Sequence, residues 1–204
     1  MLQTRTVEPG TLGLLKSLML LPGLEQFFLV GGTALALQLG HRFSVDLDLF
    51  TTEPFDKAEL LEILNQDFTV SVESESKNIF ITYINNVKVD FVKVAYPTLY
   101  PVLEVEGLRM LQVADIAPMK LSAITGRGSK KDFYDIYFLL RLMPLEDMLR
   151  LFLDKFKQHE IFHVHKSLTY FEDAERQDDP MIFEESVSWQ NIKDTIREAV
   201  KKAS

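Results

Sequence analysis

The spacing of hydrophobic residues changes near residue 110, and this change constrains the fold more than any other feature of the sequence. Before it, alternating runs predict the strands of a small sheet: 68–72, 78–84 and 87–94, with Asn85–Asn86 as a tight hairpin turn. After it, apolar residues recur with the period of a helix, which predicts helices at 113–125, 131–142, 145–158 and 188–202. We therefore expect an α+β fold, with an α/β core over residues 1–110 and a helical region over 111–204 packed on it as one compact unit.

The first 65 residues contain a second, denser arrangement of elements. Leucine spacing predicts a helix over 12–21, which Pro22–Gly23 ends. A short apolar run at 27–30 reads as a strand, and the next segments follow in order: a glycine turn at Gly31–Gly32, a buried helix over 33–39, a strand over 45–50 and a helix over 55–65. A strand that passes through a glycine turn into a helix is the usual frame of a ligand site.

Composition removes several classes of function. The chain has no cysteine, which excludes disulfide frameworks, thiolate zinc sites, iron–sulfur clusters and cysteine nucleophiles. A net charge of -8 opposes general attraction to polyanions, so contact with nucleic acid requires a local basic patch. We find neither a signal peptide nor an apolar run long enough to span a bilayer, and we expect a cytoplasmic protein with no membrane partner.

Gly31–Gly32 is a candidate phosphate cradle. Glycine allows backbone amides to approach a ligand, and the N-terminus of the following helix favours an anion. A close-packed turn with no ligand would use the same two residues. Taken alone, the pair does not decide between these interpretations.

Carboxylates gather on the predicted strands that follow. Asp46 and Asp48 alternate with apolar residues and share one face of a strand, where a divalent cation, most naturally Mg²⁺, would neutralise them. Asp90, in the strand over 87–94, is a third candidate ligand, and three acids on two strands could hold two metal ions for phosphoryl transfer. A solvated edge strand and an exposed sheet residue are the alternatives. Arg42 and Ser44, just ahead, could bind phosphate or cap the turn.

Residues 116–131 form a local basic stretch of the kind that contact with nucleic acid would require in this acidic protein. They contain no acid and four cations: Lys120, Arg127, Lys130 and Lys131. Two helical turns separate Lys120 from Arg127, so both can face a cleft and bind a triphosphate or RNA phosphates; a solvated surface is the alternative. Asp132 and Asp135 share a face of the next helix and could position these cations. A zinc site at His159, His163 and His165 is disfavoured, because no organised third ligand is evident.

At this point the ordered motifs resemble the AbiEii/AbiGii toxin-like nucleotidyltransferases, a branch of the DNA polymerase β-type superfamily. The first segments are Phe-Leu-Val-Gly31-Gly32-Thr-Ala-Leu-Ala-Leu and Arg42-Phe-Ser44-Val-Asp46-Leu-Asp48-Leu-Phe50. Met119-Lys120-Leu-Ser-Ala-Ile-Thr-Gly-Arg127 and Lys131-Asp132-Phe-Tyr-Asp135 are similar to the family's later motifs. Tyr170-Phe-Glu-Asp-Ala-Glu175 with Trp189 is similar to its carboxy-terminal signature.

The resemblance implies a nucleotidyltransferase core whose helical region closes over the nucleotide, acting as the toxin of a toxin–antitoxin system. It implies a Mg²⁺-dependent enzyme, with two ions, that moves a nucleoside monophosphate from a nucleoside triphosphate to RNA, such as the acceptor end of tRNA, and a separate antitoxin protein as partner. By position, Ser44 and Asp46 match active-site residues, Asp48 completes the metal pair, and Lys120 and Asp132 match the later motifs.

The expected roles follow from these matches. We expect Asp46, Asp48, Lys120 and Asp132 to be catalytic and Asp46, Asp48 and Asp90 to hold metal. The residues expected to bind the triphosphate are Gly31, Gly32, Ser44 and Arg127. Two alternatives remain open: transfer to a small-molecule or protein hydroxyl, and a non-catalytic interaction module on a transferase scaffold.

Overall fold

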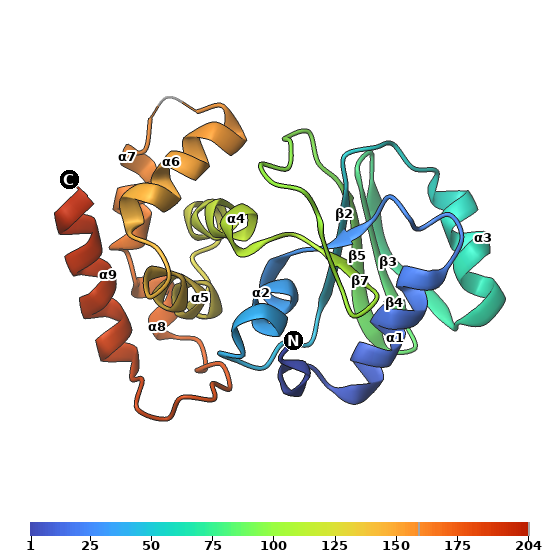
Figure 1. The fold of residues 1–204 in the computed structure, drawn as a ribbon, viewed down its shortest axis with the longest axis horizontal. Helices are drawn as coiled ribbons and strands as arrows, with labels where there is room; N and C mark the ends of the chain where they lie inside the picture. Colours follow the sequence, from blue (N-terminus) through green and yellow to red (C-terminus); the bar gives the residue numbers. More distant parts are fainter. Residues whose placement is uncertain (159, 204) are drawn as a thin grey trace.

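A single mixed sheet forms one half of the molecule and helices form the other, as the computed structural model shows for residues 1–158 and 160–203 (Figure 1). The strands run along the sheet in the order β3-β4-β5-β2-β1-β7-β6. Their bounds are β1 Phe28–Leu29, β2 Leu47–Thr51, β3 Val70–Ser76, β4 Ile79–Ile84, β5 Val87–Lys93, β6 Leu103–Val105 and β7 Leu108–Met110. The α+β class expected from the sequence is confirmed.

Local sequence explains the hairpin that joins β4 to β5. Asn85 and Asn86 both adopt positive φ, 49° and 68°, as a two-residue hairpin turn between β4 and β5 requires. The centre of the sheet is built differently, because β2 lies parallel to β5 and β1 lies parallel to β7. The hairpin of β6 and β7 was not predicted: each strand has three residues, too few to give an alternating pattern.

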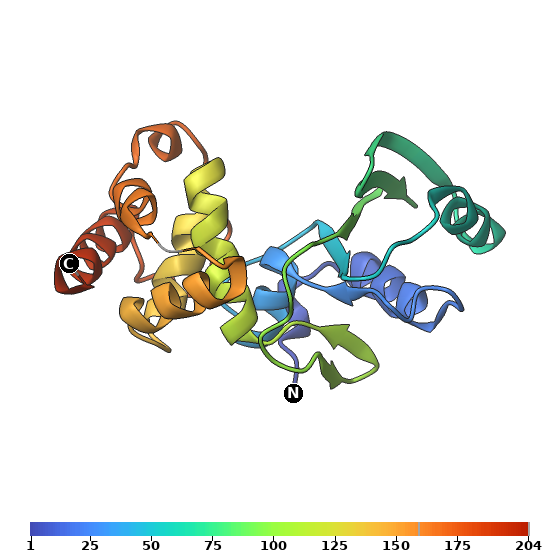
Figure 2. The ribbon, with the colours of Figure 1, turned by 90° about the horizontal axis from the view of Figure 1, so that it is seen from above.

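Helices cover the sheet and form the second half of the molecule. Figures 1 and 2 show α1 and α3 beside the sheet, α2 in the middle, and the remaining helices together on the other side. The bounds are η1 Thr4–Thr6, α1 Pro9–Leu20, α2 Gly31–Leu39, α3 Lys57–Asp67, α4 Val113–Gly126, α5 Lys130–Leu140, α6 Leu145–Phe156, α7 Phe162–Leu168, α8 Glu172–Glu175 and α9 Trp189–Ala203. Within residues 1–158 and 160–203 no helix combines the length and apolar character needed to cross a bilayer.

Helix α2 and one strand-like pairing are among the contacts that join the halves. Helix α2 packs against the sheet through β2 and against α4 and α5, so its buried residues belong to one continuous core. The segment Met181–Phe183 pairs with the backbone of His41–Phe43: the Phe43 amide donates to the Met181 carbonyl at 2.8 Å, and the Phe183 amide donates to the His41 carbonyl at 3.0 Å. A division into domains at residue 110 stays a prediction, although the last strand ends there.

Candidate active site

The start of α2 lies directly against two charged side chains. Gly31 has φ +68°, in the left-handed region, and a Cβ at this position would overlap the carboxylate of Asp48. A Cβ on Gly32 would overlap the guanidinium of Arg42. No side chain caps the helix. Both glycines are therefore required for close approach, and the first turn of α2 is a place where an anion can meet backbone amides.

Ser44 reaches the same helix end from the following segment. Its hydroxyl shares a hydrogen bond of 2.8 Å with the hydroxyl of Thr33, and it lies beside the place that a Cβ on Gly32 would occupy. Thr33 also donates to the carbonyl of Asp46. The sequence prediction placed Ser44 at the anion site but missed Thr33, which fixes the segment carrying Asp46 to the first turn of α2.

Asp48 and Asp90 lie abreast on neighbouring strands. They are register partners in the parallel pairing of β2 and β5, so both side chains project from the same face of the sheet. Burial raises the pKa of Asp48, and the carboxylate of Asp90 raises it further. The pKa of Asp90 is also raised, chiefly by burial, and its Oδ1 is buried without a hydrogen-bond partner among the described residues. Two partly buried carboxylates arranged in this way favour a cation between them.

Asp46 occupies a different position from the one expected. Strand β2 begins at Leu47, not at residue 45, because Val45 is exposed and does not continue the buried alternation. Asp46 therefore precedes the strand, and its carboxylate lies 3.7 Å from the ammonium of Lys131. Among the described residues no group of three or more histidine, aspartate or glutamate side chains is gathered closely enough to hold a metal ion, and the metal role of Asp46, Asp48 and Asp90 stays a prediction.

Lys120 is a buried cation held by two carboxylates. It is 4% exposed, and its ammonium lies 3.0 Å from Asp132 Oδ1 and 2.5 Å from Asp135 Oδ2. Burial lowers the pKa of Lys120, but the two carboxylates outweigh burial and the net shift is upward, so the ammonium is fully charged at neutral pH. These contacts confirm that Asp132 and Asp135 share a helix face; that they position Lys120, Arg127 or an acceptor hydroxyl stays a prediction.

Arg127 completes the same group of charges from the end of α4. Its guanidinium donates to both carboxylate oxygens of Asp132, at 2.8 and 3.0 Å, while 58% of its side chain remains exposed. The pKa of Asp132 is lowered because Lys120 and Arg127 together outweigh the effect of burial. Asp132 thus holds two cations at the edge of the site.

Asp135 is the centre of a buried network that the sequence analysis only partly anticipated. Arg42 forms a fork on it, with Nε 2.7 Å from Oδ1 and Nη2 2.9 Å from Oδ2, and His41 Nε2 lies 2.7 Å from Oδ1. Arg42, Lys120 and the His41 hydrogen bond hold the pKa of Asp135 well below its usual range despite burial. We expected Arg42 to bind phosphate or cap a turn; instead its Nε and Nη2 both donate to the carboxylate of Asp135. The adjacent His41 and Arg42, which follow an apolar segment, were the sequence feature that could have predicted this buried network.

A pocket of about 350 Å³ opens between these groups. Gly31 and Asp48 line it from the sheet side, and Lys120 and Arg127 line it from α4. Its apolar wall includes Phe50, Tyr96, Met119 and Phe156. Gly31, Asp48, Lys120 and Arg127 are thus the predicted site residues that line the pocket. The contacts above place four others next to them: Gly32, Ser44, Asp90 and Asp132. The volume is in the range of small-molecule sites.

The expected basic patch needs correction. Lys120 and Lys130 are buried, and Lys130 is paired with Asp179 at 3.0 Å, because helical packing places them against acidic partners rather than in solvent. Arg127 and Lys131 are the two exposed cations of the stretch. Of the histidine group, His159 lies outside the described residues, and His163 packs near the ring of Phe152.

Solved structures share this fold. A protein of H. pylori described as a nucleotidyltransferase superposes with a TM-score of 0.62 at 17% identity, covering 96% of this chain and 97% of its own. JHP933 from Helicobacter pylori gives 0.59 at 16% identity over 97% of this chain and 94% of its own. MenT4, a nucleotidyltransferase toxin from Mycobacterium tuberculosis H37Rv, gives 0.55 at 16% identity over 91% and 78%.

Sequence comparison goes further than fold. An uncharacterized protein of Aquifex aeolicus (strain VF5) is 34% identical over 185 residues, which is 87% of this chain and 88% of the relative. A family model described as nucleotidyl transferase AbiEii toxin, type IV toxin–antitoxin system, matches residues 13–203. This span contains the glycine turn, the carboxylates of β2 and β5, and the charged helices α4 and α5. The chain therefore belongs to the AbiEii family of nucleotidyl transferase toxins.

Proposed function

We propose that this protein transfers a nucleoside monophosphate from a nucleoside triphosphate to a hydroxyl of RNA, such as the acceptor end of tRNA, and releases pyrophosphate. The acceptor oxygen attacks the α-phosphorus, and the bond between the α-phosphorus and the bridging oxygen breaks as pyrophosphate leaves. The observation that carries the proposal is the pair Asp48 and Asp90, register partners on β2 and β5, of which Asp48 lines a pocket together with Gly31 of α2 and Lys120. Carboxylates and cations that line one pocket suit phosphoryl transfer.

The residues present fit divalent metal ions. Asp90 Oδ1 is buried without a partner in the described chain, and Asp48 carries a raised pKa beside it, so both would gain from a cation. Oxygen ligands of this kind suit Mg²⁺. We assign Asp48 and Asp90 as the residues that would hold it, with Asp46 joining them once its carboxylate leaves Lys131. Bound Mg²⁺ supplies neutralisation of the charge that develops on the phosphoryl oxygens.

The triphosphate is held by groups on both sides of the pocket. Backbone amides at the start of α2 and the hydroxyl of Ser44 bind phosphate oxygens from the sheet side. Lys120 and Arg127 bind from α4, where their charges stabilise the phosphates and the leaving pyrophosphate. Asp132 acts as a positioning residue, since it contacts both cations and lies behind them.

An RNA acceptor is supported by the exposed cations at this site. Arg127 and Lys131 present positive charge to solvent beside the catalytic carboxylates, in a protein whose net charge is -8. Local positive charge of this kind attracts phosphodiesters. The toxin family implies a separate antitoxin, and we expect growth inhibition by this protein to need the transferase chemistry.

A labelling experiment tests the proposal. Purified protein is incubated with each α-labelled nucleoside triphosphate, Mg²⁺ and total RNA, and the labelled species are separated into RNA, protein and small molecules. We expect label in RNA with wild-type protein and none with Asp48→Asn. Asp154→Asn removes the same charge from an exposed position of α6 and serves as the matched control. Label in protein or a small molecule would replace the RNA acceptor, and no label in any fraction would overturn the transferase assignment.

A further inference from the structure

A second hollow, of about 450 Å³, lies at the opposite end of α2 from the catalytic pocket. Gly31 at the start of α2 lines the catalytic pocket, whereas Leu39 at its end, with Gly40 and His41, lines this one. A helix of nine residues separates the two by roughly 13 Å along its axis. The second hollow is therefore distinct from the site described above.

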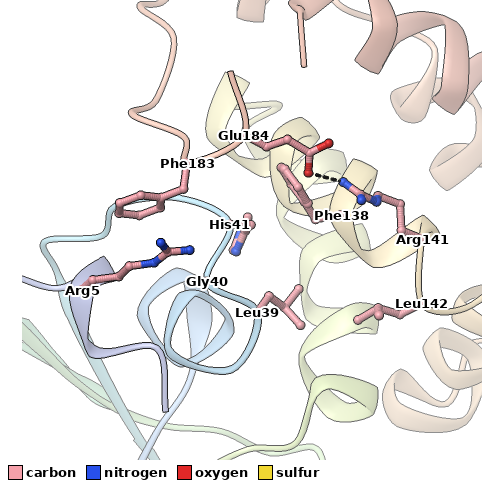
Figure 3. Close-up of a pocket in the computed structure, with 9 residues that line it drawn as sticks. All are labelled: Arg5, Leu39, Gly40, His41, Phe138, Arg141, Leu142, Phe183 and Glu184. Carbon is pink, nitrogen blue, oxygen red and sulfur yellow. Dashed lines mark hydrogen bonds and ion pairs between the residues drawn. The ribbon is translucent and has the colours of Figure 1, made fainter. Parts of the chain in front are cut away.

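Two arginines and two phenylalanines define this hollow, which we call the arginine pocket: Arg5, Phe138, Arg141 and Phe183, with His41 and Glu184. Figure 3 shows Arg5 and Phe183 on one side, Phe138 and Arg141 on the other, and His41 between them. The guanidinium of Arg5 lies 4.7 Å from the ring centroid of Phe183, and that of Arg141 lies 5.5 Å from the centroid of Phe138. Each guanidinium therefore lies within cation–π distance of a ring.

The charge of the arginine pocket suits one phosphate. Arg141 donates to Glu184 at 2.6 Å, and Arg5 has no acidic partner within the part of the chain described. Two guanidiniums and one carboxylate leave a single net positive charge among the lining side chains. A triphosphate would meet Glu184 with too much negative charge, whereas a phosphodiester or a single phosphate group matches the pocket.

His41 lines the arginine pocket, but its ring is covered. The residue is 3% exposed, its Nε2 donates to Asp135, and its Nδ1 is buried with no partner among the described residues. Burial lowers the pKa of His41, so the ring is neutral near pH 7 and adds no charge to the pocket. The charge that meets a ligand therefore comes from Arg5, Arg141 and Glu184.

We propose that the arginine pocket binds one nucleotide unit, with its phosphate on Arg5 and Arg141 and its base against Phe138 and Phe183. An aromatic base suits the phenylalanine rings, and one phosphate suits the two guanidiniums. Such a unit has two sources, a free nucleoside monophosphate and a residue of a bound RNA strand. Only binding of an RNA strand rests on the proposed function, because the pocket would then hold part of the RNA acceptor.

Calorimetric titration of the full chain in EDTA, without triphosphate, tests the proposal independently of catalysis. The probes are each nucleoside monophosphate and a short single-stranded oligoribonucleotide. Arg5→Gln should weaken binding at least about tenfold, as loss of a charge-assisted hydrogen bond requires. Arg150→Gln, at an exposed position of α6, should leave binding unchanged.

A second pair of variants tests the aromatic wall. Phe183→Ala should weaken binding about fivefold or more, because the base loses its contact surface. Phe162→Ala, at a more exposed phenylalanine on α7 that lies outside the pocket, is the control. Binding of mononucleotides identifies a free nucleotide as the ligand, and binding of the oligoribonucleotide alone identifies RNA. The proposal fails if neither probe binds at millimolar concentration, or if Arg5→Gln weakens binding no more than Arg150→Gln does.

Discussion

Replacing Gly31 with alanine tests the close approach of α2 to the catalytic carboxylate. Gly31 combines two constraints, a left-handed φ of +68° and a Cβ position that overlaps the carboxylate of Asp48. Two other glycines separate these constraints: Gly107 has φ +78° with nothing within 4 Å of its Cβ position, and Gly13 lies in α1 with open space and an ordinary helical backbone. The three alanine variants therefore form a matched series.

The magnitudes follow from the geometry. A left-handed backbone costs a non-glycine residue about 1–2 kcal/mol, so Gly107→Ala should lower the melting temperature by roughly 2–8 °C in a domain of this size. Gly13→Ala should raise stability by about 0.5–1 kcal/mol, because alanine is a better helix former. Gly31→Ala carries the backbone cost of Gly107→Ala and, in addition, must displace Asp48.

Activity separates Gly31 from its controls. A displacement of about 1 Å at a catalytic group can cost on the order of 100-fold, so Gly31→Ala should lose at least that much transfer of label from triphosphate to acceptor. Gly107→Ala and Gly13→Ala should keep wild-type rates, measured below their melting temperatures. If Gly31→Ala matched Gly107→Ala in both melting temperature and rate, the contact between Gly31 and Asp48 would have no role in the site.

Three further predictions concern the charged groups. Asp48→Asn should lose at least about 100-fold in transfer. Because the pKa of Asp48 is raised, its ionised form opposes folding above that pKa, and the variant should have a higher melting temperature than wild type at pH 7. Mg²⁺ should raise the melting temperature of the wild type only. Lys120→Met and Lys155→Met each break a buried ion pair and should each cost about 3–5 kcal/mol, yet only Lys120→Met should lose triphosphate affinity in calorimetry; equal affinities would limit Lys120 to packing. Because the pKa of Asp132 is lowered in the folded protein, ionised Asp132 contributes stability above its unfolded pKa of about 3.9. This stability is lost as the pH falls through the folded pKa. In urea unfolding between pH 7 and 3, the free energy of unfolding should therefore fall more steeply for wild type than for Asp132→Asn. Parallel curves would contradict that assignment.

Local patterns predicted most elements of the fold because their cause is local. The hairpin at Asn85–Asn86 and the helices α4 and α5 follow from turn chemistry and from the period of their apolar residues. The sheet order could not be predicted in the same way, since the parallel pairs of β1 with β7 and β2 with β5 depend on contacts between distant segments. The strand-like pairing of Met181–Phe183 with His41–Phe43 has the same cause and leaves no periodic trace in the sequence.

The sequence predicted a set of site residues but not their geometry. Asp48, Lys120 and Asp132 came from their motifs, and the structure places each beside a charged partner, while their roles stay predictions. Partner choice was harder, because a sequence shows charge but not burial. Nothing in the stretch around Lys130 distinguishes a buried lysine from a solvated one, and Arg42 could equally have faced a phosphate until Asp135 was placed beside it.

The fork of Arg42 on Asp135 has a consequence for when the protein becomes able to act. Its two partners are 93 residues apart in the chain, and the later one lies on α5, so the site cannot be complete while a ribosome is still making the first half. At translation rates of about 5–20 residues per second, this delay is on the order of 5 to 20 s. The closing contact from Met181–Phe183 comes later still. The nascent chain therefore lacks the complete charge network of the site for most of its synthesis.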